Sequence, residues 1–333
     1  MTRMAIVTLA GDLHAYVIRQ RMKDTHGIDV AIVAADRLAA AGGVAWHNKG
    51  GHPVTLPTEE GDRVDVGELD LVWWRRAHGR PTVPDSVTDP GMRKLVVKDN
   101  RSALRGVLLA AFHGTWLSDP YATERAQNKL LQLTIAREVG LTVPRTLVSS
   151  NPDTVRTFAR SQGGTVIAKT LTGLLGTSLE AGRVHVDTLV TDAEMALSAT
   201  IYQEEVPGTD HLRVMVFGDD VHAARISSGA LDWRLANDMT VEPVTVDPTL
   251  GAQLRAVTER LGLRMGVFDL KIRPDGQVVF LEVNPQGQFL LVEGMSDMPL
   301  GDAFATFAAR ELAHARSEGG SGTGADERLP LPR

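Results

Sequence analysis

The N-terminal part of the chain alternates short apolar runs with an amphipathic segment. An apolar run that ends near Leu9 predicts a strand, and a second run that ends near Val33 predicts another. Between them, Leu13, Val17 and Ile18 share one face of a predicted helix. This order predicts a βαβ unit. The turn after the first strand lacks a G-x-G-x-x-G loop, so the pattern gives little support for dinucleotide binding.

The next segments predict a strand over residues 69–77 and a helix over residues 123–141. The strand carries a tryptophan pair and then an arginine pair, which we interpret as a sheet face and its charged end rather than as a site. In the helix, Thr123 is a candidate N-cap and Gly140 a candidate end. Its apolar positions recur at four-residue spacing, at Leu131, Ile135 and Val139.

Short apolar strands and turns alternate through the second half of the chain. Strand-like runs occupy residues 165–171, 199–206, 212–228 and 267–289. The composition shifts near Pro120, and a second joint is expected around residues 204–208. From about Ser317 the chain is rich in Gly, Ser and Pro, which predicts a disordered tail.

Composition narrows the class of protein. With 333 residues, 43% of them hydrophobic, the chain is long enough for two or three domains. A net charge of −6 disfavours a nucleic-acid partner. The absence of cysteine excludes thiolate nucleophiles and Cys-based metal sites. The N-terminus fits neither a signal peptide nor a spanning helix, so a soluble cytoplasmic protein without a membrane partner is expected.

The hairpin over residues 267–289 carries polar groups that its apolar character does not explain. Glu282 and Asn284 precede Pro285, and because side chains alternate across a strand these two polar groups share one face. Asp269 lies on the preceding strand, before a Pro-Asp-Gly turn signal. A two-residue or four-residue loop would place Asp269 directly across from Glu282, whereas a three-residue loop would send them to opposite faces.

Two carboxylates facing each other would repel unless a cation lies between them. At a Cβ separation of roughly 5 Å, the repulsion is about 3 kcal/mol for an effective dielectric constant near 20. A divalent cation would reverse its sign, and oxygen ligands from Asp, Glu and Asn suit Mg²⁺. The alternative is a solvent-facing hairpin whose carboxylates splay into water.

Several lysine and arginine residues lie on or near other predicted strands and on the predicted helix. Lys169 precedes a glycine-containing loop of the kind that approaches phosphates, and Lys129 lies on the predicted helix. Arg213 and Arg225 would be cross-strand neighbours if a three-residue loop joined their strands. Arg234 adds a third guanidinium. Each residue alone would be interpreted as a surface cation, but together they indicate an anion site.

A strand exit crowded with polar side chains suggests a nucleotide hinge. Gln203, Glu204, Glu205 and Asp210 all lie where the apolar strand over residues 199–206 ends or just beyond. At such a hinge an adenine is typically bound by a backbone carbonyl and amide, and a ribose by a nearby carboxylate.

The order of these parts resembles the ATP-grasp superfamily of carboxylate–amine ligases. More narrowly, residues 128–152, 202–234 and 266–294 look like the graspetide (microviridin-type) peptide maturases, with L-R-V-x-V-x-G-D, D-W-R and N-P-x-G-Q as the specific motifs. The resemblance extends to about Leu312. It implies an α/β (α+β) ATP-grasp fold with a pre-ATP-grasp βαβ domain over 1–119, a central domain over 120–202, a C-terminal antiparallel-sheet domain over 203–316, and a tail over 317–333.

The resemblance also implies roles for individual residues. Those expected to contact ATP phosphates are Lys129 and Lys169. The adenine hinge would consist of Gln203, Glu204 and Val206, and the ribose would be held by Asp210 or Glu205. The expected ligands of two Mg²⁺ ions are Asp269, Glu282 and Asn284. The residues expected to stabilise the transferring phosphoryl group and the acyl phosphate are Arg213, Arg225 and Arg234.

The function implied by this resemblance is ATP-dependent peptide cyclisation. A side-chain carboxylate of a ribosomal precursor peptide would become an acyl phosphate, and a Ser/Thr hydroxyl or a Lys amine of that peptide would then capture it as an ester or amide. Recognition of a leader segment, a homodimer and a mobile cover at residues 170–182 are further expectations. The alternatives are a ligase that joins small molecules or adds amino acids to a protein tail, and an ATP-binding scaffold without turnover.

Overall fold

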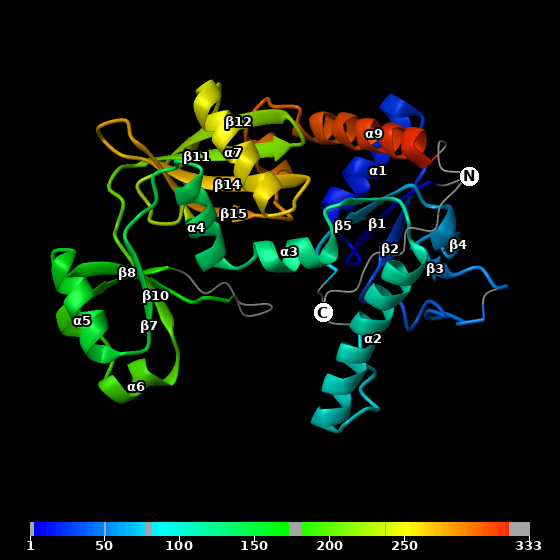
Figure 1. The fold of residues 1–333 in the computed structure, drawn as a ribbon, viewed down its shortest axis with the longest axis horizontal. Coiled ribbons are helices and arrows are strands. Elements are labelled where there is room, and N and C mark those ends of the chain that lie inside the picture. The colour runs from blue at the N-terminus through cyan, green and yellow to red at the C-terminus, as the bar shows by residue number, and fades with distance from the viewer. Residues whose placement is uncertain (1–2, 50, 78–81, 173–180, 237, 320–333) are drawn as a thin grey trace. The chain divides into compact units, whose positions relative to one another are not determined.

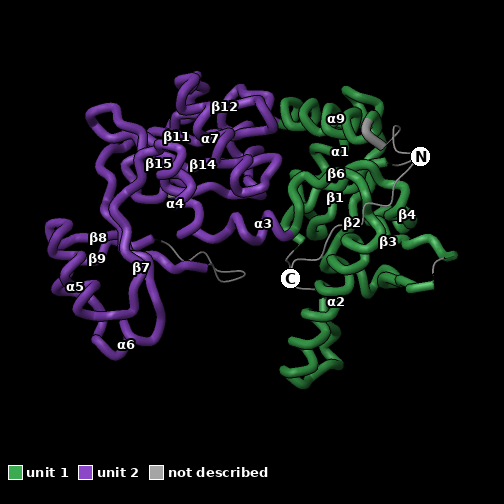
Figure 2. The backbone as a smooth tube through the Cα atoms, viewed as in Figure 1, with its two compact units in different colours: residues 1–120, 301–333 green, residues 121–300 purple. Residues whose placement is uncertain are grey.

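The computed structural model describes residues 3–49, 51–77, 82–172, 181–236 and 238–319 (Figure 1). The chain forms two compact units, residues 1–120 with 301–333 and residues 121–300 (Figure 2). The division into domains at residues 119, 202 and 316 stays a prediction. Most of the predicted tail over 317–333 lies outside the described residues. Among the helices that are described, none is both long and apolar enough to cross a bilayer.

The first unit is built on a parallel sheet of strand order β2-β1-β5-β6. It contains β1 (Met4–Thr8), α1 (Leu13–His26), β2 (Val30–Ala34), β3 (Thr55–Pro57), β4 (Arg63–Asp65), the 3-10 turn η1 (Val66–Glu68), β5 (Leu71–Trp74), α2 (Pro90–Ala111), β6 (Thr115–Leu117) and α9 (Leu300–Gly319). The predicted βαβ unit is therefore confirmed as β1-α1-β2. Parallel strands are buried on both faces, and β1 and β2 are buried along their whole length.

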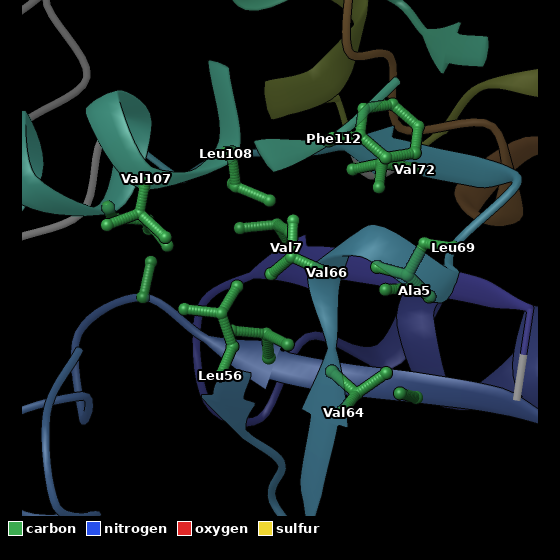
Figure 3. Packing of buried hydrophobic residues seen from close by; sticks show 14 of the residues in the cluster. Ala5, Val7, Leu56, Val64, Val66, Leu69, Val72, Val107, Leu108 and Phe112 are labelled. Atoms are coloured by element: carbon green, nitrogen blue, oxygen red, sulfur yellow. The ribbon is translucent and has the colours of Figure 1, made fainter. Parts of the chain in front are cut away.

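The core of the first unit fills the space between one face of this sheet, the β3-β4 hairpin and α2 (Figure 3). Its members include Ala5, Val7, Leu56, Val64, Val72, Leu104, Val107, Leu108 and Phe112. Helix α1 buries Ala15, Ile18 and Met22, but Leu13 is 64% exposed. The prediction that Leu13 faces the core was wrong, because Asp12 caps the helix and Leu13 occupies its first position.

Arg75, the first arginine of the pair that follows β5, does not form a solvated end of the strand. This side chain is fully buried, and its Nε donates to Asp12 Oδ2 at 2.7 Å. Thr8 Oγ1 donates to the same carboxylate oxygen at 2.6 Å. Burial alone would raise the pKa of Asp12, but the Arg75 guanidinium and these hydrogen bonds hold it below its usual value. Arg75 therefore joins the carboxyl ends of β1 and β5 as part of the interior.

The second unit contains two antiparallel sheets, of strand order β7-β10-β8-β9 and β13-β12-β11-β14-β15. Its elements are α3 (Pro120–Ala126), α4 (Lys129–Glu138), β7 (Thr146–Ser149), α5 (Pro152–Ser161), β8 (Thr165–Lys169), β9 (Gly182–His185), the turn η2 (Val186–Thr188), α6 (Asp192–Leu197), β10 (Thr200–Gln203), β11 (Asp210–Phe217), β12 (Asp220–Ser227), the turn η3 (Trp233–Leu235), β13 (Thr240–Val244), α7 (Pro248–Arg260), β14 (Met265–Ile272), β15 (Val278–Asn284) and α8 (Leu290–Met295). A core between the larger sheet and helices α4 and α7 includes Ile135, Val214, Leu254, Phe268 and Phe280.

The helix predicted over residues 123–141 is divided into α3 and α4. Asn128 starts α4, since its Oδ1 accepts from the backbone N–H groups of Leu130 and Leu131, both at 3.1 Å. Thr123 is buried within α3 and does not cap this helix. Asn is a favoured N-cap, so α4 begins at the residue after Asn128. The predicted end is confirmed, because Gly140 has the left-handed φ of 87° that closes a helix.

Candidate active site

The carboxylate hairpin has the predicted pairing but a different loop. Asp269 on β14 lies directly opposite Glu282 on β15. The backbone N–H of Arg273 donates to the carbonyl of Gln277 at 2.9 Å, so the loop has the three residues 274–276. A three-residue loop would have separated the carboxylates. A register shift next to Asp269 restores their alignment.

This shift is a β-bulge, and it explains how one strand serves both the core and the site. Leu270 pairs with Phe280, whereas Asp269 pairs with Glu282, so Leu281 is the extra residue. Phe280 and Val283 consequently both face the core, while Glu282 faces the other side of the sheet. The expected loop lengths were wrong, and the expected pairing of the two carboxylates is confirmed.

Each carboxylate of the pair has a cation beside it. Arg213 Nη1 donates to Asp269 Oδ1 at 2.6 Å, from the facing position on β11. Lys129, at the start of α4, forms an ion pair with Glu282. Burial would raise the pKa of Glu282, but Lys129, Lys169 and Arg234 lower it to about 2. Glu282 is therefore an anion throughout the neutral range, surrounded by cations from three other elements.

Lys169 is the last residue of β8, and Glu282 and Asp269 both act on its charge. Its Nζ donates to Gln203 Oε1 at 2.9 Å, and Gln203 Nε2 donates to Thr146 Oγ1 at 2.8 Å. Burial lowers the pKa of Lys169 to about 8, although Glu282 and Asp269 act in the opposite direction. The two predicted phosphate lysines are thus brought together with the predicted carboxylates.

The D-W-R motif supplies the N-cap and the first two residues of the short turn η3, and it contacts two arginines. Asp232 accepts from Arg234 Nε and Nη2, both at 2.8 Å, and this hydrogen bonding raises the pKa of Arg234. The buried Trp233 ring lies 6.0 Å from the Arg213 guanidinium carbon. Arg234 could be predicted from the sequence, whereas the contacts of Asp232 and Trp233 with the two arginines could not. Their position within the motif was the available signal.

Arg225 does not lie with the cations around Asp269 and Glu282. The turn between β11 and β12 has two residues, so Arg225 pairs with Leu212 and Arg213 pairs with Ala224. Leu212 faces the core, and Arg225 therefore leaves the sheet on the face opposite to Arg213, where it is exposed. The expectation that Arg213 and Arg225 are cross-strand neighbours was wrong. A role for Arg225 in phosphoryl transfer stays a prediction that the register does not favour.

The polar residues of the predicted hinge have internal partners. Glu204 accepts from Arg145 Nε at 3.1 Å and from Arg273 Nη2 at 2.5 Å. Glu205 pairs with Arg183, whose Nη2 donates at 2.7 Å.

Asp210, a candidate for the ribose, and Val206, a candidate for the hinge, differ in their surroundings. Asp210 accepts from Ser227 Oγ at 2.6 Å. Val206 is buried. Beside the hinge, a cavity of about 530 Å³ opens between the face of α4 and strands β7 and β10. Its volume falls in the range of small-molecule pockets.

Gln132 is a structural residue of the site that the sequence analysis missed. Its buried Nε2 donates to the carbonyls of Ala126 at 2.6 Å and Val283 at 2.8 Å, and its Oε1 accepts from the N–H of Val283 at 3.0 Å. It thus holds α4, which carries Lys129, against the strand that carries Glu282. A glutamine on the buried side of a helix was the only sequence signal.

We expect Gln132→Leu to lower the free energy of unfolding by about 3 kcal/mol, because it leaves the buried N–H and C=O of Val283 without these partners. Urea unfolding would measure the loss. The exposed Gln127→Leu serves as the matched control and should change stability little. Equal stabilities for the two variants would contradict this account of Gln132.

Gly287 allows the segment after β15 to pack directly against β14. A Cβ placed there would lie 1.9 Å from Val267 Cγ2, so only glycine allows this approach to β14. Pro285 follows the last residue of β15, as predicted. Asn284 Oδ1 accepts from the N–H of Gln286 at 3.0 Å, which orients the amide. The residues 173–180 of the predicted cover lie outside the described part of the chain.

The oxygen donors around the carboxylate pair can be compared with the ligands that Mg²⁺ prefers. In the described parts of the chain, no three His, Asp or Glu side chains gather to hold a metal ion. The oxygens that could bind a metal ion at the carboxylate pair belong to Asp269 and Glu282. The exposed amide of Asn284 lies at the same end of β15. An oxygen-only set with two carboxylates fits Mg²⁺, which keeps several waters and binds few protein ligands. The residues present fit the ion.

Comparison with known proteins gives structural and sequence relatives. The structure is similar to macrocyclase MdnC from Microcystis aeruginosa MRC, solved bound with precursor peptide MdnA, with a TM-score of 0.82 and 25% identity over 93% of this chain and 100% of that chain. It is also similar to ATP-grasp ligase PsnB, solved with a phosphomimetic variant of a minimal precursor, Mg and ADP, with a TM-score of 0.76 and 21% identity over 93% and 99% of the two chains.

A curated sequence from Thioalkalivibrio sulfidiphilus (strain HL-EbGR7), a probable alpha-L-glutamate ligase, is 26% identical over 212 residues, which is 61% of this chain and 69% of that protein. No protein-family model matches the sequence. The predicted α/β fold of the ATP-grasp type is confirmed by these likenesses.

Proposed function

We propose that this chain, an ATP-grasp ligase of the graspetide maturase type, is an ADP-forming macrocyclase of a ribosomal precursor peptide. The observation that carries this proposal is the facing pair Asp269 and Glu282, with Lys129, Lys169, Arg213 and Arg234 around it. The likeness to MdnC over nearly the whole chain supports a peptide as the substrate.

The chemistry proceeds in two steps that need charge and positioning rather than a protein nucleophile. A carboxylate oxygen of the peptide attacks the γ-phosphorus of ATP, and the bond from that phosphorus to the bridging oxygen of ADP breaks. A hydroxyl or amine of the same peptide then attacks the acyl carbon and loses its proton, and phosphate leaves. Each ring forms with the net loss of one water from the peptide.

The residues of this chain would stabilise negative charge during both steps. Arg213, oriented by Asp269 and Trp233, and Arg234, oriented by Asp232, would contact the phosphoryl oxygens. Lys129 and Lys169 would bind the ATP phosphates, and Gln203, Glu204 and Val206 would form the adenine hinge. Asp269, Glu282 and Asn284 would hold Mg²⁺, which supplies charge neutralisation when bound. Two ions, a leader-bearing peptide partner, a homodimer and a cytoplasmic location belong to the same proposal.

A second candidate is supported by the sequence relatives. The likeness to probable alpha-L-glutamate ligases favours an enzyme that adds an amino acid to a protein or peptide end. The two reactions share activation by ATP, so the nucleotide residues do not separate them. The mass of the product does, since cyclisation removes water and amino-acid addition increases the mass.

We expect the chain, incubated with ATP, Mg²⁺ and a precursor peptide encoded beside its gene, to release ADP and yield a product lighter by one water for each ring. Mass spectrometry with fragmentation would locate the rings. A reaction without ATP serves as the control. ADP release at background with this peptide would contradict the proposal, and a heavier product in the presence of glutamate would favour the second candidate.

A further inference from the structure

The smaller sheet of the second unit has an apolar core face and a second face that carries a polar row. Tyr202 and Val166 belong to the core that the sheet forms with α5 and α6. The opposite face carries Thr146 on β7, Gln203 on β10 and Lys169 on β8, three strands that lie side by side (Figure 1). Thr146 is paired directly with Gln203, and Lys169 lies two positions beyond the β8 partner of Gln203. The three side chains therefore leave the sheet on the same side.

The hydrogen bonds of this row can run in only one direction. The Lys169 ammonium has donors and no acceptor, so the atom of Gln203 that it contacts at 2.9 Å must be the amide oxygen. The amide nitrogen of Gln203 therefore faces Thr146, and it donates to Thr146 Oγ1 at 2.8 Å. Thr146 Oγ1 donates its own proton to the carbonyl of Pro144 at 2.9 Å. Because a hydroxyl has one proton, Thr146 can only accept from Gln203, which fixes the orientation of the amide.

The amide oxygen is what holds Lys169 at the small sheet. Gln203 is 4% exposed, so water is excluded from most of its side chain. Among the described residues, Gln203 Oε1 is the only hydrogen-bond acceptor of Lys169, while the charges of Asp269 and Glu282 attract the ammonium. If the amide turned over, its N–H groups would face the ammonium. Lys169 would then move towards the carboxylate pair and away from its present position.

We propose that Thr146 is a positioning residue of the nucleotide site, which orients the Gln203 amide so that its oxygen keeps the Lys169 ammonium in place for the nucleotide phosphates. This inference rests on the proposed function in taking Lys169 as a phosphate-binding residue. Thr146 lies on the edge strand β7 and in the wall of the cavity beside the hinge, and it acts through Gln203. Its effect should therefore be confined to ligands that carry phosphates.

Calorimetric titration with ADP and Mg²⁺, and with adenosine, which has no phosphates, tests the proposal without peptide or turnover. Thr146→Val keeps the shape of the side chain but removes the acceptor, so we expect ADP to bind about five- to tenfold more weakly. The affinity for adenosine should stay within about twofold of the wild type. Thr146→Ser keeps the hydroxyl and should restore most of the affinity for ADP. Thr146→Ala, which also lacks the hydroxyl, should repeat the result of Thr146→Val.

The matched control is Thr134→Val, the same substitution in the wall of the same cavity. Thr134 Oγ1 donates to the carbonyl of Leu130 at 2.9 Å, and no side chain in the described part of the chain donates to it. We expect this variant to bind both ligands as the wild type does, and thermal unfolding would show that all variants keep the fold.

Three results would overturn the proposal. Thr146→Val and Thr146→Ala could bind ADP as the wild type does, they could lose affinity for ADP and adenosine equally, or Thr146→Ser could fail to restore the binding of ADP. Each of these would leave the macrocyclase function standing. The expected losses of ADP affinity without any ring formation would instead refute the macrocyclase function and leave the role of Thr146 standing.

Discussion

Glu282→Gln is expected to abolish turnover of ATP and peptide while the fold stays intact. The amide has nearly the shape of the carboxylate, so the pairing of β14 with β15 and the bulge between them should persist. The variant loses the anion that Lys129 faces and that we assign to Mg²⁺. Loss of charge stabilisation at a phosphoryl-transfer site reduces kcat on the order of 10³-fold.

ADP release and mass spectrometry of the peptide would measure this effect, and thermal unfolding would show that the fold is kept. The matched control is Glu138→Gln, which removes a surface carboxylate paired with Arg260 and should leave turnover unchanged. A Glu282→Gln variant as active as the wild type would remove Glu282 from the metal ligands. A variant that fails to fold would show that the pair with Lys129 is needed for the structure itself.

The hairpin shows how far alternation along a strand can predict a site. The side-chain period of two placed Glu282 and Asn284 on one face, and the pairing of Glu282 with Asp269 is confirmed. The predicted loop length was wrong, and the β-bulge at Leu281 restores the pairing that a three-residue loop would have broken. A bulge depends on how Phe280 and Val283 pack in the core, and local sequence does not report that packing.

Other features of the site depended on partners that are distant in sequence. A two-residue turn between β11 and β12 moved Arg225 to the opposite face, because one residue of register exchanges the faces of a strand. Gln132 is bonded to Val283, 151 positions away. Arg75 is buried because Asp12 and Thr8 meet it at the ends of parallel strands. Residue types and strand periods were thus readable from the sequence, whereas register and long-range polar contacts were not.

Arg234→Ala is expected to reduce kcat far more than it weakens the binding of ATP. The Arg234 side chain is 51% exposed, so its loss should leave the fold stable. Its fork is held by Asp232 within a short turn, and Asp269 and Glu282 contribute to its raised pKa, which indicates that it lies near the carboxylate pair. An arginine held in this way acts on charge that develops during transfer.

We therefore expect kcat to fall on the order of 10²–10³-fold while the dissociation constant of ATP changes by less than about threefold. Arg160→Ala, an exposed arginine on α5, is the matched control. Arg225→Ala provides the comparison across the sheet, and its loss of kcat should be the smaller because Arg225 leaves the opposite face. Equal losses in kcat and in ATP affinity for Arg234→Ala would make Arg234 a nucleotide-binding residue. In that case Arg213, which is 5% exposed and bonded to Asp269, would be the remaining candidate to stabilise the transferring phosphoryl group.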